Sequence, residues 1–449
     1  MEKQRENFGS KFGVIAAAAG SAVGLGNIYR FPCEAGENGG GAFLIVYLLI
    51  IVFLGIPLML SEFIIGRRSH RNTVGAFKTL APKTVWPIVG FVCVISSFLI
   101  LAFYSTIAGW TLECIYKSLI NFYHGKSISE IEQGMTTFNN SFRPFIWQTL
   151  FIILTAFIVL RGIEKGIEKY AKVLMPMLFV ILIILCVKSL TLPNATEGLK
   201  FFFKPDFSKI TPEVCISALG QAFFSLSVGM GVQITYGSYI NKKDNLLTSS
   251  TSVVMTDTLV AILAGITIFP AAFAMGISPK AGAGLAFNTL PLIFNQMAGG
   301  YIFCLIFFIL LAIAALTSTI SLLEASVAYF VEEHAIKRKK ATIWCAIGAL
   351  VVGLFATLSL KDNSNLVIGN MSFFNILDNL TANILMPVGG LLITIFIGWK
   401  LKKTAFIDEL TNQGTTKIAL KNIIFFITKY IAPLAIVTII VGRLVFNIK

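Results

Sequence analysis

The residues best placed to do chemistry lie in a glycine-rich run within the first apolar stretch of the chain. This run, G-S-A-V-G-L-G-N-I-Y-R-F-P from Gly20 to Pro32, contains three glycines within seven residues, followed by Asn27 and Arg30. Because each Gly in a helix interior costs about 1 kcal/mol relative to Ala, we expect the helix to break there. Irregular backbone at membrane depth persists only where it lines a cavity or is buried in protein.

A second run, Ser227–Gly231 (S-V-G-M-G), echoes Ala22–Gly26 (A-V-G-L-G). Two broken helices at corresponding points of two halves indicate a transporter binding site near the middle of the membrane. Free carbonyls at such breaks suit a cation, and half-helix N-termini suit an anion.

Composition places these runs in a membrane. The 449 residues are 56% hydrophobic and 13% charged, whereas soluble domains carry about 25% charged residues. The net charge of +14 does not indicate a nucleic-acid partner, because Lys and Arg gather between apolar stretches. This positive-inside bias predicts a cytoplasmic N-terminus and, with an odd number of spans, a C-terminus outside.

Stretches of roughly 20 apolar residues predict an all-α membrane protein of about 11 transmembrane helices. We expect one transporter domain, 1–449, built as a 5+5 inverted repeat with helices 1 and 6 broken: 11–190 forms the first repeat, 212–400 the second, and 421–445 helix 11. The expected spans are Phe12–Phe31, Ala42–Ile65, Trp86–Ile120, Pro144–Leu160, Tyr170–Leu190, Val214–Tyr239, Leu246–Ala274, Tyr301–Phe330, Ile343–Leu360, Phe374–Trp399 and Ile423–Val445.

Enzymatic chemistry is not indicated. His70, His124 and His334 are far apart, and no HExxH or GxSxG motif accompanies them. The seven cysteines form no metal-binding or disulfide pattern, so we interpret them as small packing residues.

The motifs resemble those of the neurotransmitter:sodium symporter family, in its bacterial amino-acid branch. The resemblance is carried by Gly20–Pro32, Glu37–Phe43, Gly55–Leu58 with Glu62, Ile234–Tyr239 and Leu316–Ser318. It implies sodium-coupled import of an amino acid by alternating access across a bacterial inner (plasma) membrane. A monomer or weak homodimer in the lipid bilayer is expected.

The resemblance also implies two Na⁺ sites. Site 1 would use the Ala22 carbonyl, Asn27, Ser225 and Asp257, together with the substrate carboxylate. Site 2 would use the carbonyls of Gly20, Val23 and Ala314 and the hydroxyls of Thr317 and Ser318. Ordinary hydrogen bonding between helices is the alternative role for the two hydroxyls.

Asp257 stands where many family members have Asn. Tyr47, Gln221 and Ser225 match parts of the family's chloride site. We hypothesise that Asp257 supplies the compensating negative charge, so that chloride is not required. A protonated Asp257, hydrogen-bonded in the core, is the alternative.

The substrate is expected to be a neutral, large apolar or aromatic L-amino acid. Monoamine-carrying relatives place Asp where this chain has Gly24, so a whole amino acid fits better than an amine. Tyr104 matches the tyrosine that binds the substrate carboxylate. The expected lining is Ser21, Ala22, Gly24, Gly26, Ile100, Tyr104, Phe224, Ser227, Met230, Thr319 and Leu322.

Gates and supports follow from the same resemblance. Arg30 and Asp378 would pair across the outer mouth; Arg5 and Glu332, with Tyr239 nearby, would pair at the inner one, unless they are an ordinary surface pair. Glu62 would hold the unwound sixth helix. Unwinding between Gly166 and Pro176 would open a water path to site 2, although a plain proline kink is an alternative. Glu324 has no assigned role. The alternative function is a proton-coupled or exchanging carrier, with Asp257 or Glu324 carrying the proton.

Overall fold

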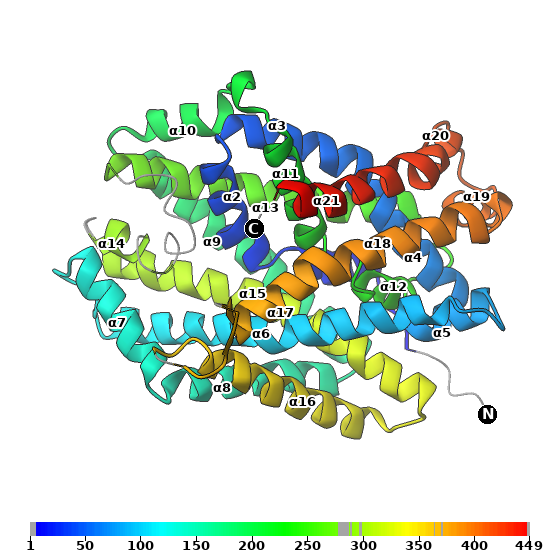
Figure 1. The fold of residues 1–449 in the computed structure, drawn as a ribbon, viewed down its shortest axis with the longest axis horizontal. Helices are drawn as coiled ribbons and strands as arrows, with labels where there is room; N and C mark the ends of the chain where they lie inside the picture. Colours follow the sequence, from blue (N-terminus) through cyan, green and yellow to red (C-terminus); the bar gives the residue numbers. More distant parts are fainter. Residues whose placement is uncertain are drawn as a thin grey trace.

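The computed structural model describes residues 6–276, 287, 290–295, 299–362, 364–369 and 371–446. It is almost entirely helical, and most helices run along the longest axis of the molecule (Figure 1). The first half contains α1 Lys11–Ala22, η1 Gly26–Arg30, α2 Phe31–Glu37, α3 Gly41–Ile50, η2 Ile51–Gly55, α4 Ile56–Ser69, α5 Thr73–Leu80, α6 Pro87–Leu119, α7 Ile128–Asn140, α8 Arg143–Leu160, η3 Ile163–Glu168, α9 Lys169–Leu190, α10 Ala195–Phe203 and η4 Phe207–Lys209.

The second half begins with another interrupted helix. It contains α11 Pro212–Ser225, α12 Val232–Gly237, α13 Leu246–Ala274, α14 Leu290–Asn295, α15 Gly300–Glu333, α16 Arg338–Leu358, the antiparallel strands β1 Val367–Ile368 and β2 Met371–Ser372, α17 Phe373–Asn379, η6 Leu380–Leu385, α18 Met386–Ile395, η7 Phe396–Lys400, α19 Lys403–Leu410, α20 Lys421–Phe426, η8 Ile427–Ile431 and α21 Ala432–Phe446.

The predicted all-α membrane fold is confirmed. Within the described residues, nine helices are long and apolar enough to span a membrane, and α1 with η1–α2 forms a tenth span bent by 51°. The remaining predicted span, the sixth, Val214–Tyr239, consists of α11 and α12, neither of which reaches spanning length alone. Helix α13 has the predicted bounds, Leu246–Ala274.

The two breaks have local causes. Helix α1 begins at the Ser10 cap, whose hydroxyl accepts the Gly13 N–H, and ends where Val23 turns to an extended ψ of 99°. Between α11 and α12, Gly229 and Gly231 adopt φ of 81° and 76°, values open to Gly at little steric cost. Ser227 also adopts a left-handed φ of 51°, and its hydroxyl donates to the Ser21 carbonyl at 3.0 Å. The two breaks are therefore bonded to each other.

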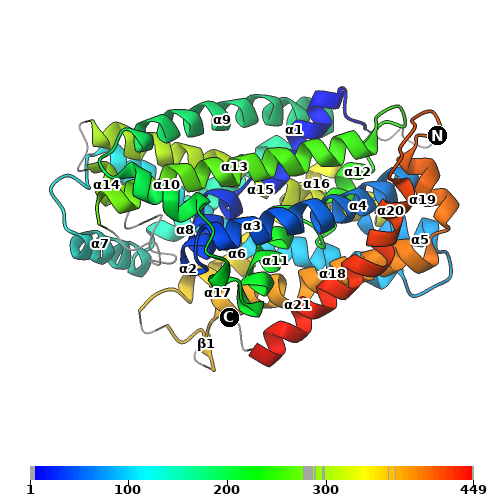
Figure 2. The ribbon, with the colours of Figure 1, turned by 90° about the horizontal axis from the view of Figure 1, so that it is seen from above.

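The longest helices, α6 and α15, pack against each other in the middle of the molecule (Figure 1). Helices α9 and α21 lie on opposite outer faces (Figure 2). They expose apolar side chains, such as Val180 on α9 and Leu434 on α21, as a surface that faces lipid does. Polar side chains in the middle of α15, such as Thr317 and Ser318, are buried inside.

Candidate functional site

A small cavity lies at the two helix breaks. Its volume is about 30 Å³, and it is lined by Ser21, Ala22, Gly24, Gly26, Ile100, Tyr104, Phe224, Ser227, Met230, Ser318 and Leu322. Every residue of the predicted lining is present except Thr319, whose place is taken by Ser318. One step along a helix turns a side chain by about 100°, so Thr319 points away from the cavity and its Oγ1 lies 2.9 Å from Thr155 Oγ1.

The glycines of the first break bring the backbone to the cavity wall. A Cβ on Gly24 would lie 2.4 Å from Ser318 Oγ and 2.9 Å from the Tyr104 hydroxyl, and one on Gly26 would lie 3.0 Å from the Phe224 ring. Tyr104 accepts the N–H of Leu25 at 3.0 Å. A side chain at Gly24 would therefore fill the space beside the tyrosine hydroxyl.

The residues predicted for Na⁺ site 1 form a buried polar cluster. Asn27 Nδ2 donates to Asp257 Oδ1 at 2.7 Å, to the Asp257 carbonyl at 3.1 Å and to Ser225 Oγ at 3.0 Å. Ser225 Oγ also donates to Asp257 Oδ2 at 2.7 Å. Asn27, Ser225 and Asp257 are each fully buried. The amide nitrogen is thus surrounded by oxygen atoms of the kind that bind a hard cation.

Residues of the predicted chloride site border this cluster. The Tyr47 hydroxyl lies 3.3 Å from Ser225 Oγ and 3.5 Å from Asp257 Oδ2. Gln221 Nε2 donates to the Gly26 carbonyl at 2.9 Å. The Asp257 carboxyl group therefore faces both Tyr47 and Ser225.

The residues predicted for Na⁺ site 2 come from α1 and α15. Thr317 Oγ1 lies 3.0 Å from the Ala314 carbonyl and 3.4 Å from the Val23 carbonyl. A Cβ on Gly20 would lie 3.3 Å from Thr317 Cβ, which brings α1 close to α15 at this point. Ser318 Oγ donates instead to the Ser21 carbonyl at 3.3 Å.

Side chains of other helices hold the unwound segment between α11 and α12. Glu62 Oε1 accepts the Gly229 N–H at 2.6 Å, which is the contact predicted for Glu62. Thr73 Oγ1 and Ser97 Oγ donate to the carbonyls of Gly231 and Met230 at 2.8 and 2.5 Å. Sequence reasoning missed Thr73 and Ser97, because a hydroxyl in an apolar helix carries no signal of its partner.

The outer gate differs from the prediction. Arg30 Nε lies 3.6 Å from Glu34 Oε1, one helical turn away, and its guanidinium carbon lies 4.6 Å from the centre of the Phe224 ring. Among the ion pairs of the described residues, none joins Arg30 to Asp378. Glu34 Oε2 also accepts the Ser217 hydroxyl at 2.5 Å. The i,i+4 spacing of Arg30 and Glu34 is the feature of the sequence that indicates this pair.

On the inner side, Arg5 lies outside the described residues, so the Arg5–Glu332 pair is not tested. Glu332 Oε2 accepts the Asn72 backbone N–H at 2.7 Å. Tyr239 donates to Glu324 Oε1 at 2.7 Å, and Arg338 forms an ion pair with the same carboxylate. Glu324, which had no role from the sequence, thus joins α15 to α16 and to the turn that follows α12.

Gly166 lies in the π-helical turn η3, and Pro176 lies inside α9. A Cβ on Gly166 would come within 2.4 Å of the Ile158 carbonyl. Helix α9 is continuous across Pro176, so this segment is wound in the structure.

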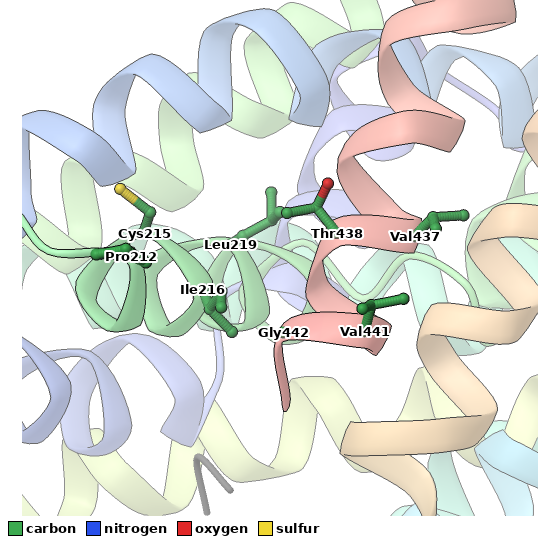
Figure 3. A pocket seen from close by; sticks show the side chains of 8 residues that line it. All are labelled: Pro212, Cys215, Ile216, Leu219, Val437, Thr438, Val441 and Gly442. Atoms are coloured by element: carbon green, nitrogen blue, oxygen red, sulfur yellow. The ribbon is translucent and has the colours of Figure 1, made fainter. Parts of the chain in front are cut away.

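A larger pocket, of about 610 Å³, lies between α11 and α21 (Figure 3). Its walls are mostly apolar, with Ile216, Leu219 and Val441 among them. The hydroxyl of Thr438 is engaged with the Leu434 carbonyl at 2.9 Å. This pocket offers little to bind an ion or a zwitterion, so the smaller cavity is the candidate site.

Two broken helices around buried oxygen clusters are the arrangement typical of a binding site in a secondary transporter. The family model of the sodium:neurotransmitter symporter family matches residues 5–124 and 120–448. The chain belongs to this family, whose members are sodium-coupled transporters and not enzymes, as predicted.

Known proteins are similar to this chain over between 60% and 98% of its length. A sodium-dependent transporter of Bacillus subtilis (strain 168), YhdH, is 40% identical across 98% of this chain and 97% of its own length. The sodium-dependent neutral amino acid transporter B(0)AT3 of Rattus norvegicus is 31% identical over 60% of this chain and 48% of its own. The crystal structure of MhsT in complex with L-phenylalanine matches with a TM-score of 0.90 and 43% identity, covering 98% of this chain and 99% of that one.

Proposed function

We propose that this protein imports a neutral, large apolar or aromatic L-amino acid together with Na⁺ by alternating access. The observation that carries the proposal is the cavity between the two broken helices, whose walls combine glycine backbone and Tyr104 with apolar side chains and no charged one. An uncharged wall suits a zwitterion whose own charges meet backbone groups and an ion. MhsT, which resembles this chain throughout, was crystallised with L-phenylalanine.

The substrate's two ends would meet different parts of the wall. The carboxylate would bind near Tyr104 and the backbone amides beside Gly24, at the positive ends of half-helices. The apolar side chain would lie among Ile100, Met230 and Leu322. A cavity of about 30 Å³ offers little more space than one water molecule requires. Substrate binding would therefore move Phe224, which forms part of the wall.

Two sodium ions would couple to this substrate. At site 1, a half-turn of the Asn27 amide would exchange Nδ2 for Oδ1 and complete an oxygen cage with Ser225 and Asp257. At site 2, the Thr317 hydroxyl and the Val23 and Ala314 carbonyls, which lie within 3.4 Å of it, would bind the second ion with Gly20 and Ser318. Site 1 would also take the substrate carboxylate, which links ion and substrate binding directly.

Chloride would not be required. The Asp257 carboxylate faces Tyr47 and Ser225. These two residues match parts of the family's chloride site. A fixed negative charge there balances a sodium ion without a second ion. An intramembrane carboxylate costs several kcal/mol unless it is paired, and sodium supplies the pair.

The gates would act in turn. Arg30 would exchange Glu34 for Asp378 as the outer mouth closes, and the contacts of Tyr239 and Glu332 would open on the inner side. Unwinding between Gly166 and Pro176 would let water reach site 2. We place the protein in a bacterial plasma membrane with its N-terminus in the cytoplasm, as a monomer or weak homodimer.

The test is uptake of radiolabelled L-phenylalanine into proteoliposomes. We expect uptake with an inward Na⁺ gradient, equal in chloride and gluconate, and none when K⁺ replaces Na⁺. Uptake driven by a proton gradient in K⁺ would overturn the proposal in favour of a proton-coupled carrier. Competition by unlabelled leucine and tryptophan, but not by glutamate or lysine, would define the substrate class.

A further inference from the structure

Glu168, at the end of η3, caps the beginning of helix α1. Its Oε2 accepts the Gly9 backbone N–H at 2.6 Å, and its Oε1 accepts the Ser10 hydroxyl at 2.9 Å. The side chain is only 1% exposed, although Lys172, one turn later, pairs with it at 2.5 Å. Gly9 precedes the capping residue Ser10, whose hydroxyl in turn accepts the Gly13 N–H. Glu168 therefore holds the start of α1 through its cap, and a carboxylate near a helix N-terminus is favoured by the helix dipole.

Glu6 makes the complementary contact. Its Oε2 accepts the N–H of Ile163, the first residue of η3, at 2.7 Å. Glu168, at the end of η3, thus binds the residues just before α1, and Glu6, which precedes α1, binds the first residue of η3. We call this pair, Glu6 and Glu168 with their backbone partners, the reciprocal cap.

Glycines make room for both carboxylates. A Cβ on Gly13 would lie 2.1 Å from Glu168 Oε1, and a Cβ on Gly162 would lie 2.6 Å from Glu6 Oε2. Gly162 also has a φ of 84°, a conformation that side chains disfavour. The close approach of α1 to η3 therefore depends on small residues on both sides.

The N-terminal segment has a second, separate anchor. The Phe8 N–H donates to the Tyr239 carbonyl at 3.1 Å, and Asn241 Nδ2 donates to the Phe8 carbonyl at 3.0 Å. Phe8 also packs edge-on against Tyr236. Loss of the reciprocal cap alone would leave this anchor in place, so the segment would loosen without the protein unfolding.

We propose that Glu168 and Glu6 are positioning residues that make the closing of the inner path depend on the state of helix α9. This inference rests on the proposed alternating access. Glu168 lies between Gly166 and Pro176, the segment expected to unwind. Unwinding would draw the carboxylate from Gly9 and Ser10 and free the first half of the broken helix to move, whereas rewinding would reseat it. Water access to site 2 and release of α1 would then be one event.

The test compares Glu168→Gln and Glu6→Gln with the wild-type protein by amide hydrogen–deuterium exchange in Na⁺ and in K⁺, without substrate. Hydrogen bonds to charged groups are the stronger class, so each variant is expected to exchange about tenfold faster in Na⁺. The increase should appear in both segments, 9–13 and 163–168, whichever carboxylate is changed. The double variant should add little to either single one, because both break the same cap.

Glu164→Gln is the matched control. It removes an equal charge from the same turn. Glu164 Oε1 lies beside Gly9, 3.2 Å from where a Gly9 Cβ would be, but Glu164 accepts no hydrogen bond from the described residues 6–10. We expect its exchange to match the wild type. Glu168→Gln should also raise the Na⁺ concentration for half-maximal uptake severalfold while maximal uptake stays within about twofold, since a loosened inner gate weakens site 2 and not the later steps.

The proposal is overturned if faster exchange is confined to the segment that carries the substitution, or if Glu164→Gln has the same effect. Should Glu168→Gln fail to fold, the exposed Glu6 provides the same test. The exchange experiment needs no substrate, so failure to transport phenylalanine would contradict the proposed substrate without touching the reciprocal cap.

Discussion

The side-chain amide nitrogen of Asn27 lies 2.7 Å from Oδ1 of Asp257, at the centre of a fully buried cluster. The two residues come from the first broken helix and from α13, 230 positions apart. Their contact places a hydrogen-bond donor where the proposed function needs a cation. In the proposed function, the charge of Asp257 is the one that balances the sodium ion at site 1.

Asp257→Asn keeps an oxygen ligand but removes the negative charge. We expect uptake in sodium gluconate to fall about tenfold or more, because a charge in a low-dielectric site interacts strongly. Chloride should restore most of it, since Tyr47 and Ser225 would then face an anion. The measurement is uptake against chloride concentration at fixed Na⁺. A wild-type protein that itself requires chloride would contradict the hypothesis.

Thr317→Val tests Na⁺ site 2 with almost no change of shape. Loss of the hydroxyl ligand should raise about tenfold the Na⁺ concentration that gives half of the maximal thermal stabilisation of the purified protein. Thr319→Val is the matched control, because Thr319 faces Thr155 on α8 and not the cavity. Equal effects of the two substitutions would mean that the hydroxyls serve packing between helices only.

Tyr104→Phe tests the carboxylate contact. A hydrogen bond to a charged group is worth about 1.5–3 kcal/mol, so we expect KM for the amino acid to rise about tenfold to a hundredfold. The corresponding amine, phenethylamine, should compete poorly with either protein. An unchanged KM in Tyr104→Phe would place the carboxylate elsewhere.

Glu34→Gln tests the partner exchange of Arg30. With its present partner uncharged, Arg30 should turn more readily to Asp378 and hold the outer mouth closed. Because partly exposed ion pairs contribute little, the bound amino acid should dissociate only about two- to fivefold more slowly. Asp378→Asn should have the opposite effect on the dissociation rate. Faster dissociation from Glu34→Gln would indicate that Glu34 itself stabilises the closed state.

The sequence predicted those features that depend on local composition. Glycine runs indicated both helix breaks, and an unbroken apolar stretch set the bounds of Leu246–Ala274. The motif around Glu62 indicated that this residue holds the unwound sixth helix, and in the structure Glu62 accepts the Gly229 N–H. These signals lie within one helix or one motif, so no knowledge of packing was needed.

Contacts that depend on how the helices pack could not be predicted from the sequence. The cavity lining differs at Thr319 and Ser318, where one residue decides which helix a side chain faces. The hydrogen bonds of the reciprocal cap join residues 157 to 159 positions apart, in segments that only the fold brings together. The residues around Glu6 do not indicate that its carboxylate binds Ile163, and the residues around Glu168 do not indicate that its carboxylate binds Gly9 and Ser10.

The most direct test of the central claim is thermal stabilisation of the detergent-purified protein by each of the twenty amino acids, in sodium chloride, sodium gluconate and potassium chloride. A ligand that binds only the folded state stabilises it by RT ln(1 + [L]/Kd) and so raises the melting temperature as its concentration exceeds Kd. We predict stabilisation by large apolar and aromatic amino acids in both sodium salts and none in potassium chloride. Equal stabilisation in potassium chloride would contradict sodium-coupled amino-acid binding.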